Sequence, residues 1–456
     1  MRRLIMLLIL LSSAVFGLEV KGYLEMGNSS AVSMIDGTSK VVIAYENSDT
    51  DINGVKIVDY SDPTNLKIIG TYDVNKSSVN DIKIVGDIMY VTTSNGINGS
   101  TPNNTQFDVV DISDTFNPKL IKRVSVYQNG FISGVKVAIS HDKTKLAVST
   151  YYKTKIYDIT DPKNPVEKVD LSSVDNSADS SAMYALSFSV DDKYIFTVND
   201  LNYDSAIYNI ENLSDVKLTD KFRTVGWVST LVQSKDGSKV IISDTWNKYL
   251  NIYDFNNGLL SNEQNISLGS SNEPQDMVMT KDGKYIYIAV GGNQDHPGVM
   301  VYDVPNQTIA EDINLSDSGW FATRGIALSE DETTLVVTTD INTYIVDTGR
   351  SISTNTDDFS ITIKPGWNLL GATTDMDISI FPDSIKSIWR YENGNWLLHI
   401  NSALQNITTD NFGFTNLTHI SKGQGFWVYN ETSDDVIIDS NSTTNDVNGS
   451  KKDSEK

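Results

Sequence analysis

The chain has 456 residues, no cysteine and a formal net charge of −23 at pH 7. This length exceeds that of one ordinary domain, so a repeat array or two domains is expected. The lack of cysteine excludes disulfides, thiolate metal sites and cysteine nucleophiles, and the negative charge argues against nucleic acids and anionic membrane surfaces as partners.

The first 17 residues have the layout of a secretory signal. Arg2 and Arg3 precede an apolar run at residues 4–11, and small or weakly polar residues lead to Gly17, where cleavage is expected nearby. A membrane anchor is the alternative, but it needs about 20 apolar residues. We therefore predict a signal peptide at residues 1–17 and an exported mature chain without a transmembrane helix, located in the periplasm, at the cell surface or in the medium.

Residues 54–74, GVKIVDYSDPTNLKIIGTYDV, contain the unit that recurs along the chain. A strand with alternating side chains ends at an aspartate, a polar turn follows, and a second strand begins. The aligned residues at the end of the first strand are Asp59, Asp111, Asp158, Asn209, Asp254, Asp303 and Asp347. Their mean spacing is 48 residues, from position 59 to position 347 in six steps. Such a period with short alternating strands is typical of a β-propeller.

Two further strands joined by a tight turn precede each of these aspartates. Residues 275–290, QDMVMTKDGKYIYIAV, show the pattern best, with Asp282-Gly283 as a strong hairpin signal. Each repeat is thus an inner strand, a middle strand, the aspartate strand and an outer strand. We predict an all-β chain with a seven-bladed β-propeller over residues 18–350. The aspartates are predicted to accept backbone N–H bonds in the turns that follow them.

The seventh repeat ends after Asp347 without an outer strand, whereas the expected strand at residues 20–27 has no repeat of its own. We predict that this N-terminal strand pairs with residues 343–349 and closes the propeller, because closure removes two exposed sheet edges. The alternatives are a strand of an eighth blade and a disordered arm.

When residues 54–74 are laid beside residues 107–126, FDVVDISDTFNPKLIKRVSV, the chain resembles the LVIVD-repeat family of extracytoplasmic β-propellers. The resemblance covers residues 20–347 and is strongest in the first three repeats. The S-x-D-G hairpins of repeats four to seven are similar to those of YVTN and lactonase-type propellers. The resemblance implies the propeller fold and a binding or surface role, but little about activity, because one fold hosts many functions.

The composition changes beyond a polar linker expected at residues 351–358. ITIKPGWNLLGA at residues 361–372 and HISKGQGFWVYNET at residues 419–432 resemble phrases of a small all-β module at the C-termini of some bacterial surface proteins. We predict a small Trp-rich β domain at residues 359–439, followed by a disordered tail at residues 440–456.

Tryptophans are the candidate binding residues of this second domain. One interpretation places them in the core of a domain with few other large residues. The other makes them an aromatic surface for a glycan or a cell-surface partner. The four residues are Trp367, Trp389, Trp396 and Trp427.

Ligands of a propeller usually meet the mouth of its central channel, where the chain enters each inner strand. The residues expected there are Asn80, Asp81, Lys136, Tyr184, Trp227, Gln275, Asp276 and Arg324. Together Asp81, Asp276 and Arg324 are expected to fix a polar ligand, and Trp227 or Tyr184 to stack on a sugar or an aromatic ring. The alternative is that Arg324 pairs with Asp276 of the adjacent blade and seals the channel.

A calcium ion is the one cofactor for which the sequence offers candidate ligands. Asp49, Asp51 and Asn53 lie in a stretch, DTDING, that mimics the start of a calcium loop. The twelfth position, where an EF-hand requires glutamate, is Tyr60, and the ninth is Ile57. A simple acidic hairpin loop is therefore the favoured interpretation, and no other cofactor is expected.

Two functions fit these observations. The first is a monomeric, secreted or cell-surface, non-enzymatic binding or scaffold protein for a protein or glycan partner. The four histidines have no partner at metal-ligand spacing and no catalytic motif is present, so no catalytic residue is assigned. The second is a divalent-metal-dependent, lactonase-like hydrolase that uses Asn80, Asp81 and Asp276 as oxygen ligands at the channel mouth. We favour the first.

Overall fold

The computed structural model divides into two compact units, Met1–Ser351 and Ile352–Lys456. The predicted signal peptide (apart from Gly17), linker and tail lie outside the described residues. The structure describes residues 17–46, 53–75, 77–95, 104–127, 135–150, 153–174, 183–199, 204–224, 226–291, 298–315, 323–350, 360–372, 376–382, 384–392, 395–400, 414–417, 419–420 and 424–439.

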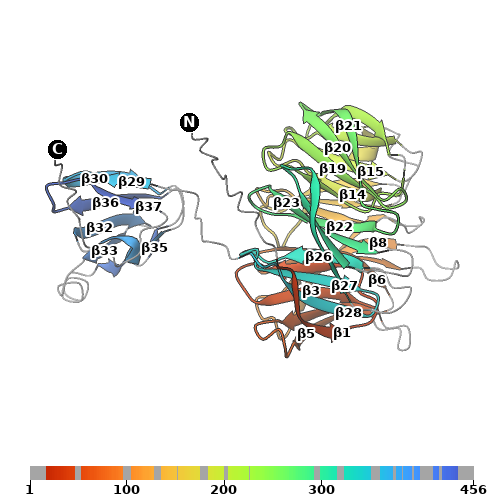
Figure 1. Ribbon diagram of the computed structural model, residues 1–456, viewed down its shortest axis with the longest axis horizontal. Coiled ribbons are helices and arrows are strands. Elements are labelled where there is room, and N and C mark those ends of the chain that lie inside the picture. The colour runs from red at the N-terminus through yellow and green to blue at the C-terminus, as the bar shows by residue number, and fades with distance from the viewer. Residues whose placement is uncertain are drawn as a thin grey trace, which may run out of the picture. The chain divides into compact units, whose positions relative to one another are not determined.

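In its described residues, the first unit contains seven four-stranded antiparallel sheets, which are the blades of a β-propeller (Figure 1). Blade 1 contains β2 (Val32–Ile35), β3 (Lys40–Tyr45), β4 (Asn53–Asp59) and β5 (Lys67–Asn75). Blade 2 contains β6 (Ser78–Val85), β7 (Ile88–Asn95), β8 (Asn104–Asp111) and β9 (Lys119–Tyr127). Blade 3 contains β10 (Val137–Ile139), β11 (Lys145–Ser149), β12 (Thr154–Asp158) and β13 (Val166–Asp170). A short 3-10 turn, η1 (Leu171–Ser173), follows blade 3.

Blades 4 to 7 repeat the same order from inner to outer strand. Blade 4 contains β14 (Met183–Phe188), β15 (Tyr194–Asn199), β16 (Asp204–Asn209) and β17 (Lys217–Arg223), and blade 5 contains β18 (Leu231–Gln233), β19 (Lys239–Asp244), β20 (Tyr249–Asn256) and β21 (Leu259–Ser267). Blade 6 contains β22 (Glu273–Met279), β23 (Tyr285–Gly291), β24 (Gly298–Asp303) and β25 (Thr308–Asn314). Blade 7 contains β26 (Thr323–Leu328), β27 (Thr334–Thr339), β28 (Asn342–Asp347) and, as its outer strand, β1 (Glu19–Glu25).

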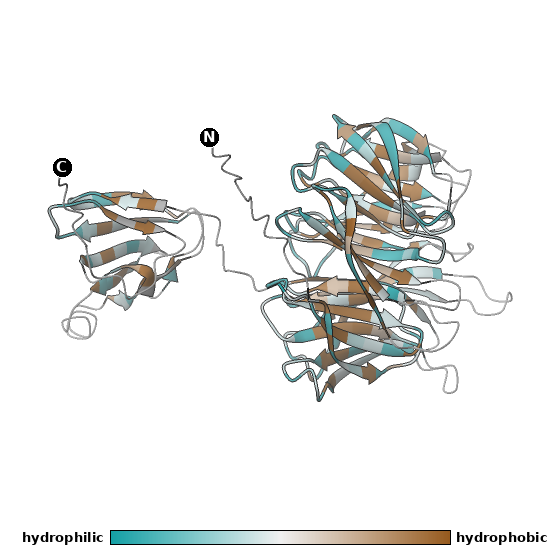
Figure 2. Ribbon diagram, viewed as in Figure 1, coloured by the Kyte–Doolittle hydropathy of each residue, from teal (hydrophilic) through white to brown (hydrophobic). Residues whose placement is uncertain are grey.

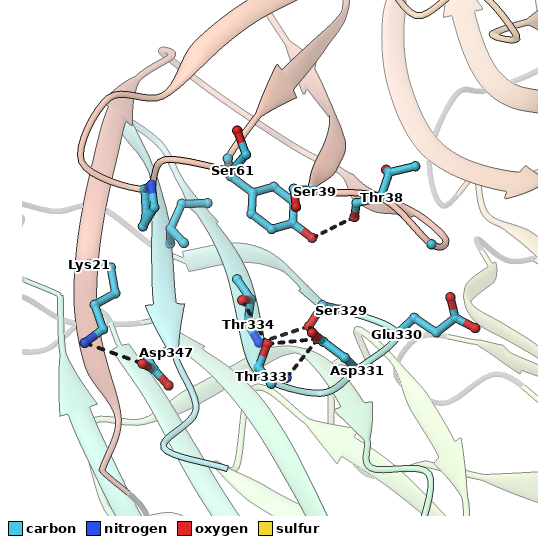
Figure 3. Close-up of a pocket in the computed structure, with 14 residues that line it drawn as sticks. Lys21, Thr38, Ser39, Ser61, Ser329, Glu330, Asp331, Thr333, Thr334 and Asp347 are labelled. Atoms are coloured by element: carbon cyan, nitrogen blue, oxygen red, sulfur yellow. Dashed lines mark hydrogen bonds and ion pairs between the residues drawn. The ribbon is translucent and has the colours of Figure 1, made fainter. Parts of the chain in front are cut away.

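The N-terminal strand closes the ring, as predicted. β1 pairs antiparallel with β28 from Glu19↔Asp347 to Glu25↔Asn342, and Lys21 Nζ lies 3.4 Å from Asp347 Oδ2 (Figure 3). The inner strand of each blade contacts the inner strand of the next, and β26 of blade 7 contacts β2 of blade 1. The first unit is therefore a closed seven-bladed wheel, and the alternatives of an eighth blade or a free arm are wrong.

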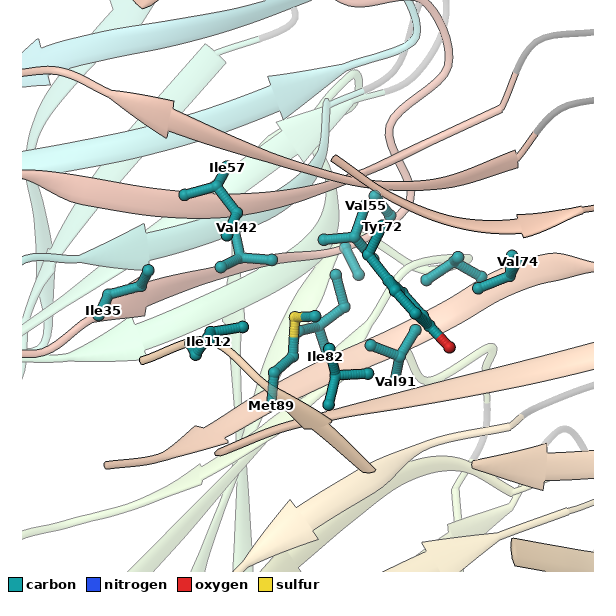
Figure 4. Close-up of a cluster of buried hydrophobic side chains, with 14 residues drawn as sticks. Ile35, Val42, Val55, Ile57, Tyr72, Val74, Ile82, Met89, Val91 and Ile112 are labelled. Atoms are coloured by element: carbon teal, nitrogen blue, oxygen red, sulfur yellow. The ribbon is translucent and has the colours of Figure 1, made fainter. Parts of the chain in front are cut away.

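Hydrophobic packing between neighbouring blades explains why the middle strands are apolar on both faces. In β3, the run from Val41 to Ala44 is completely buried, and Figure 2 shows hydrophobic residues along the strands of the propeller. Val42 and Ile57 of blade 1 belong to one buried cluster with Ile82 and Met89 of blade 2 (Figure 4). Alternation of core-facing residues on each sheet thus builds a core at the interface between blades.

The recurrent aspartates have the predicted turn-capping role. A side-chain oxygen of Asp59, Asp111 and Asp158 accepts the N–H two residues ahead, at 2.9, 2.9 and 3.0 Å. In blade 4, Asn209 does the same for Glu211 at 3.0 Å. Asp254 departs from this pattern, because β20 continues past it and its carboxylate accepts from Lys239 and Asn262 instead.

The second unit is a small all-β domain, as predicted. A five-stranded sheet has the order β30 (Gly366–Gly371), β36 (Gly425–Asn430), β32 (Ile385–Glu392), β33 (Asn395–Ile400) and β34 (Thr415–Asn416). Beside it are the pairs β29 (Ser360–Ile363) with β37 (Val436–Asp439) and β31 (Met376–Asp377) with β35 (His419–Ile420), and a 3-10 turn, η3 (Ile378–Ile380). Across the described residues of the chain, no helix is long and apolar enough to cross a membrane.

Candidate functional site

The inner strands enclose a cavity of about 450 Å³ in the centre of the propeller. Five of the eight residues predicted at the channel mouth line this cavity: Asp81, Lys136, Gln275, Asp276 and Arg324. They come from four different blades, so the repeat alignment placed them correctly around one space.

The other three predicted residues do not form part of this wall. Asn80 lies beside the cavity, where its Nδ2 donates to Ser94 Oγ at 3.0 Å. Trp227 is half exposed, and its ring packs edge-on against Trp246 with centroids 5.5 Å apart. Tyr184 belongs to β14, but its side chain lies outside the described residues.

Bulges at the start of the inner strands interrupt the alternation at three of the predicted residues. Asn80, Gln275 and Arg324 are each the extra residue at a register shift between an inner and a middle strand. A bulge re-aims side chains relative to a regular strand. Strict alternation therefore could not say which of these side chains points inward.

The two channel aspartates hold neighbouring blades together. In blade 2, Asp81 accepts the N–H of Ile82 at 2.9 Å and that of Val137, in blade 3, at 3.0 Å. Asp276 repeats this arrangement, with the N–H of Met277 at 2.9 Å and that of Ile326, in blade 7, at 3.1 Å.

Burial raises the pKa of Asp276, and the positive charges of Lys136 and Lys83 oppose this rise. These two lysines supply positive charge to the cavity of an otherwise strongly acidic chain. Lys83, two residues after Asp81 on the same strand, lines the cavity with its Nζ 3.9 Å from Asp81 Oδ1. The period of two along a strand could have identified it, but our sequence analysis missed it.

The predicted ion pair between Arg324 and Asp276 is wrong. Arg324 Nε instead donates to Asp340 Oδ1 at 2.6 Å, and Asp340 lies in the turn between the two following strands of its own blade. A local partner at the rim holds this guanidinium, so it does not seal the channel. Within the described part of the chain, the ammonium of Lys136 makes no hydrogen bond or ion pair, and it faces the cavity unpaired.

The described residues do not assemble the predicted metal ligands. They contain no group of three or more His, Asp or Glu side chains that could hold a metal ion. Asn53, at the start of β4, is buried, whereas Asp49 and Asp51 lie outside the described residues. In the central cavity, Asp81 and Asp276 both accept backbone amides and Asn80 does not line the wall, so two of the three oxygen ligands expected of a hydrolase share this space.

Aromatic side chains gather on the solvent-facing side of the second domain. We call Trp367, Trp389, Trp396, Phe414 and Trp427 the aromatic cluster; among the described residues, these five line a cavity of about 430 Å³. Trp367, Trp396 and Trp427 are 57%, 43% and 43% exposed. The rings of Trp389 and Phe414 meet nearly at right angles, at 82° with centroids 5.4 Å apart, and therefore form two walls of the cavity.

The interpretation that the tryptophans form the core of this domain is wrong. A separate cluster fills the core, and its fully buried members include Ile363, Ile388, Phe426 and Val428. In β32, buried Ile388 alternates with Trp389, so the period of two places the indole on the opposite face of the sheet. The domain thus has a complete aliphatic core and exposes its largest aromatic residues.

A third cavity, of about 680 Å³, lies between blades 7 and 1 (Figure 3). Its walls are the first hairpin of blade 7, including Ser329, Glu330 and Asp331, and the loops of blade 1 around Thr38 and Ser61. Nothing in the sequence predicts this cavity, because no residue type marks an interface between two blades.

Comparison with solved structures supports the fold. The chain is similar to the β-propeller domain of Cps50 (Swd1) from Myceliophteria thermophila, with a TM-score of 0.54 and 11% sequence identity, over 73% of this chain and 99% of that domain. At this identity the likeness shows the fold alone. No protein-family model and no curated protein matches the sequence.

Proposed function

We propose that the protein is a secreted or cell-surface, non-enzymatic binding protein in which the propeller is a rigid scaffold and the aromatic cluster contacts a glycan or protein partner. The propeller fold suits binding and scaffold roles in general. The signal-like layout of residues 1–17 supports export. Further support comes from the resemblance to the LVIVD-repeat propellers and to the C-terminal module of bacterial surface proteins.

The exposure of the aromatic cluster carries this proposal. Large aromatic rings lose favourable burial when they face water. Trp367 and Trp427 do so although the core beneath them is complete without them. Leu369 and Tyr391, also exposed, belong to the same sheet. A contiguous exposed apolar patch of this kind marks an interaction site more often than a structural element.

The chemistry of the cluster fits recognition by stacking. Tryptophan rings present flat apolar faces that pack against the C–H faces of a sugar or against side chains of a protein. Few rotatable bonds keep the loss of conformational entropy on binding low. The Trp389 indole N–H already donates to Ser387 Oγ at 3.1 Å, which fixes the orientation of this ring.

A glycan array and tryptophan fluorescence titrations test the proposal on the chain without residues 1–17. The double variant Trp396→Ala/Trp427→Ala should lose binding of any captured glycan or partner by at least about tenfold. The matched control is Trp246→Ala, which removes a 60% exposed indole from the propeller. If the double variant binds as tightly as the unmodified chain, the aromatic cluster is not the contact surface.

A further inference from the structure

A carboxylate crosses the interface between blades 3 and 4. Asp192, in the first hairpin of blade 4, has a positive φ of 55°. Its carboxylate accepts the successive backbone N–H groups of His141 and Asp142, in the first hairpin of blade 3, at 2.8 and 2.7 Å. Two successive N–H groups of this kind form an anion-binding concavity. The first hairpin of a blade therefore offers a receptor for a carboxylate of the next blade.

The interface between blades 6 and 7 uses a similar device. Glu332 of blade 7, with φ of 56°, accepts the N–H of Lys281 in the first hairpin of blade 6. Between blades 5 and 6 and between blades 4 and 5, a glycine takes the place of this acid, and the first hairpins pack tightly against each other. A Cβ at Gly283 would lie 2.8 Å from Lys235, and one at Gly237 would lie 3.1 Å from Val190.

The strands of blades 7 and 1 pack in one hydrophobic cluster, but between their first hairpins there is neither a bridging carboxylate nor close packing. The residue that faces the blade 7 hairpin is Gly37, with φ of 68°, and a Cβ there would meet only Glu330 Oε2, at 3.9 Å. Apart from the side chain of Asp331 itself, the N–H groups of Glu330 and Asp331 have no hydrogen-bond partner among the described residues. The cavity of about 680 Å³ opens at this point (Figure 3). A carboxylate receptor is thus left without its carboxylate.

The walls of this cavity indicate what else the occupant carries. Ser39 and Ser61 contribute hydroxyl groups, but Glu330, Asp331 and Asp347 make the surroundings acidic. A ligand with only negative charge would be repelled by these groups and by the net charge of −23. A ligand that also carries an ammonium group avoids this cost, because Glu330 and Asp347 are within the same cavity.

We propose that the cavity between blades 7 and 1 binds a small zwitterion of the amino-acid class. Its carboxylate accepts the N–H groups of Glu330 and Asp331, in the role that the Asp192 side chain has between blades 3 and 4. Its ammonium group faces Glu330 and Asp347. Lys281 Nζ lies 4.0 Å from Glu330 Oε1, and Lys21 Nζ lies 3.4 Å from Asp347 Oδ2. The ammonium group of the ligand therefore shares these two carboxylates with the lysines. This site is independent of the aromatic cluster.

Calorimetric titration of the chain without residues 1–17 tests the ligand class. The probes are glycine, L-serine and L-leucine, with acetate as the carboxylate-only probe and methylammonium as the ammonium-only probe. At least one amino acid should bind at one site per chain, and both single-group probes should bind about tenfold more weakly or worse. Absence of binding by all three amino acids, or equal binding of acetate, overturns the proposal.

Substitution of Gly37 tests the location. Gly37→Asp supplies an internal carboxylate at a backbone conformation that aspartate tolerates, so amino-acid binding should be lost. Gly37→Ala is the matched control: it strains the same backbone position without a carboxylate, so the Tm should fall and binding should persist. Circular dichroism establishes that both variants are folded. Amino-acid binding by Gly37→Asp equal to that of the unmodified chain places the ligand elsewhere.

Discussion

A single buried carboxylate joins donors from two blades. Asp108 of β8 is fully buried and accepts two parallel bonds from Arg123, at 2.7 Å to Nε and 2.8 Å to Nη2. The hydroxyl of Tyr72, on the outer strand of blade 1, donates to Asp108 Oδ2 at 2.7 Å. The ring of Tyr72 belongs to the hydrophobic cluster between blades 1 and 2 (Figure 4). Charge-assisted, bidentate geometry of this kind is the strong form of the hydrogen bond.

We expect Asp108→Asn to lower the free energy of unfolding by about 2 to 4 kcal/mol, because the guanidinium of Arg123 would lose its counter-charge. This loss is smaller than the largest losses seen when a buried ion pair is broken, because the Arg123 side chain is 43% exposed and solvent screens its charge. Tyr72→Phe is the control, because it removes one hydrogen bond and should cost about 1 kcal/mol. Urea unfolding measures both variants. Equal losses for the two would show that the ion pair adds nothing beyond a neutral hydrogen bond.

Closure by β1 is the element on which the ring depends. It supplies the outer strand of blade 7 from the opposite end of the propeller sequence and covers the edge of β28. It also lies against blade 1. A Cβ at Gly22 would approach the carbonyl oxygen of Pro63 to 1.8 Å, so the two backbones are almost in contact. The N-terminal strand has no repeat of its own and the seventh repeat lacks an outer strand, which was enough to predict that the two pair. The close approach of Gly22 to Pro63 has no signature in the sequence.

Gly22→Ala should push β1 away from blade 1 and loosen the closure. The added methyl group meets backbone atoms that cannot rotate away, so we expect a loss of about 1 to 3 kcal/mol. Limited proteolysis near the N-terminus should also become faster, because β1 separates more often from β28. Gly371→Ala is the control, since a Cβ there has no neighbour within 4 Å among the described atoms. Unchanged thermal stability and proteolysis of Gly22→Ala would mean that the contact yields without cost.

Repetition made the architecture of the whole molecule predictable. Alternating strands that lead to an aspartate or, in blade 4, to Asn209 occur seven times, so errors in one copy do not change the number of blades or the strand order. The candidate site was predictable only in part. Strand order placed Asp81, Lys136 and Asp276 around the channel, but Asn80, the extra residue at a bulge, does not line it. The position of Trp389 on the face opposite buried Ile388 follows from a one-residue choice of register, which composition alone does not reveal.

The repeated turns also predict how the whole propeller responds to acid. Hydrogen bonds from Ser113 lower the pKa of Asp111 to about 2, and those from Thr160 lower that of Asp158 to about 2, from an ordinary value of 3.8. A carboxyl whose pKa is lower in the folded state contributes stability above its ordinary pKa and loses it as the pH falls through the lowered value. Asp276 acts in the opposite direction, because burial raises its pKa. More aspartates have a lowered pKa than a raised one, so the free energy of unfolding should fall between about pH 4 and pH 2.

Thermal melts from pH 7 to pH 2 measure this loss, and Asp158→Asn identifies its origin. Asparagine accepts the same turn N–H without titrating, as Asn209 does in blade 4 at 3.0 Å. The variant should therefore melt close to the unmodified chain at pH 2 and slightly below it at pH 7, because the pairing with Lys168 is lost. The difference between the two melting temperatures should shrink as the pH falls from about 4 to 2. A constant difference across the whole pH range would show that the turn carboxyls do not govern acid unfolding.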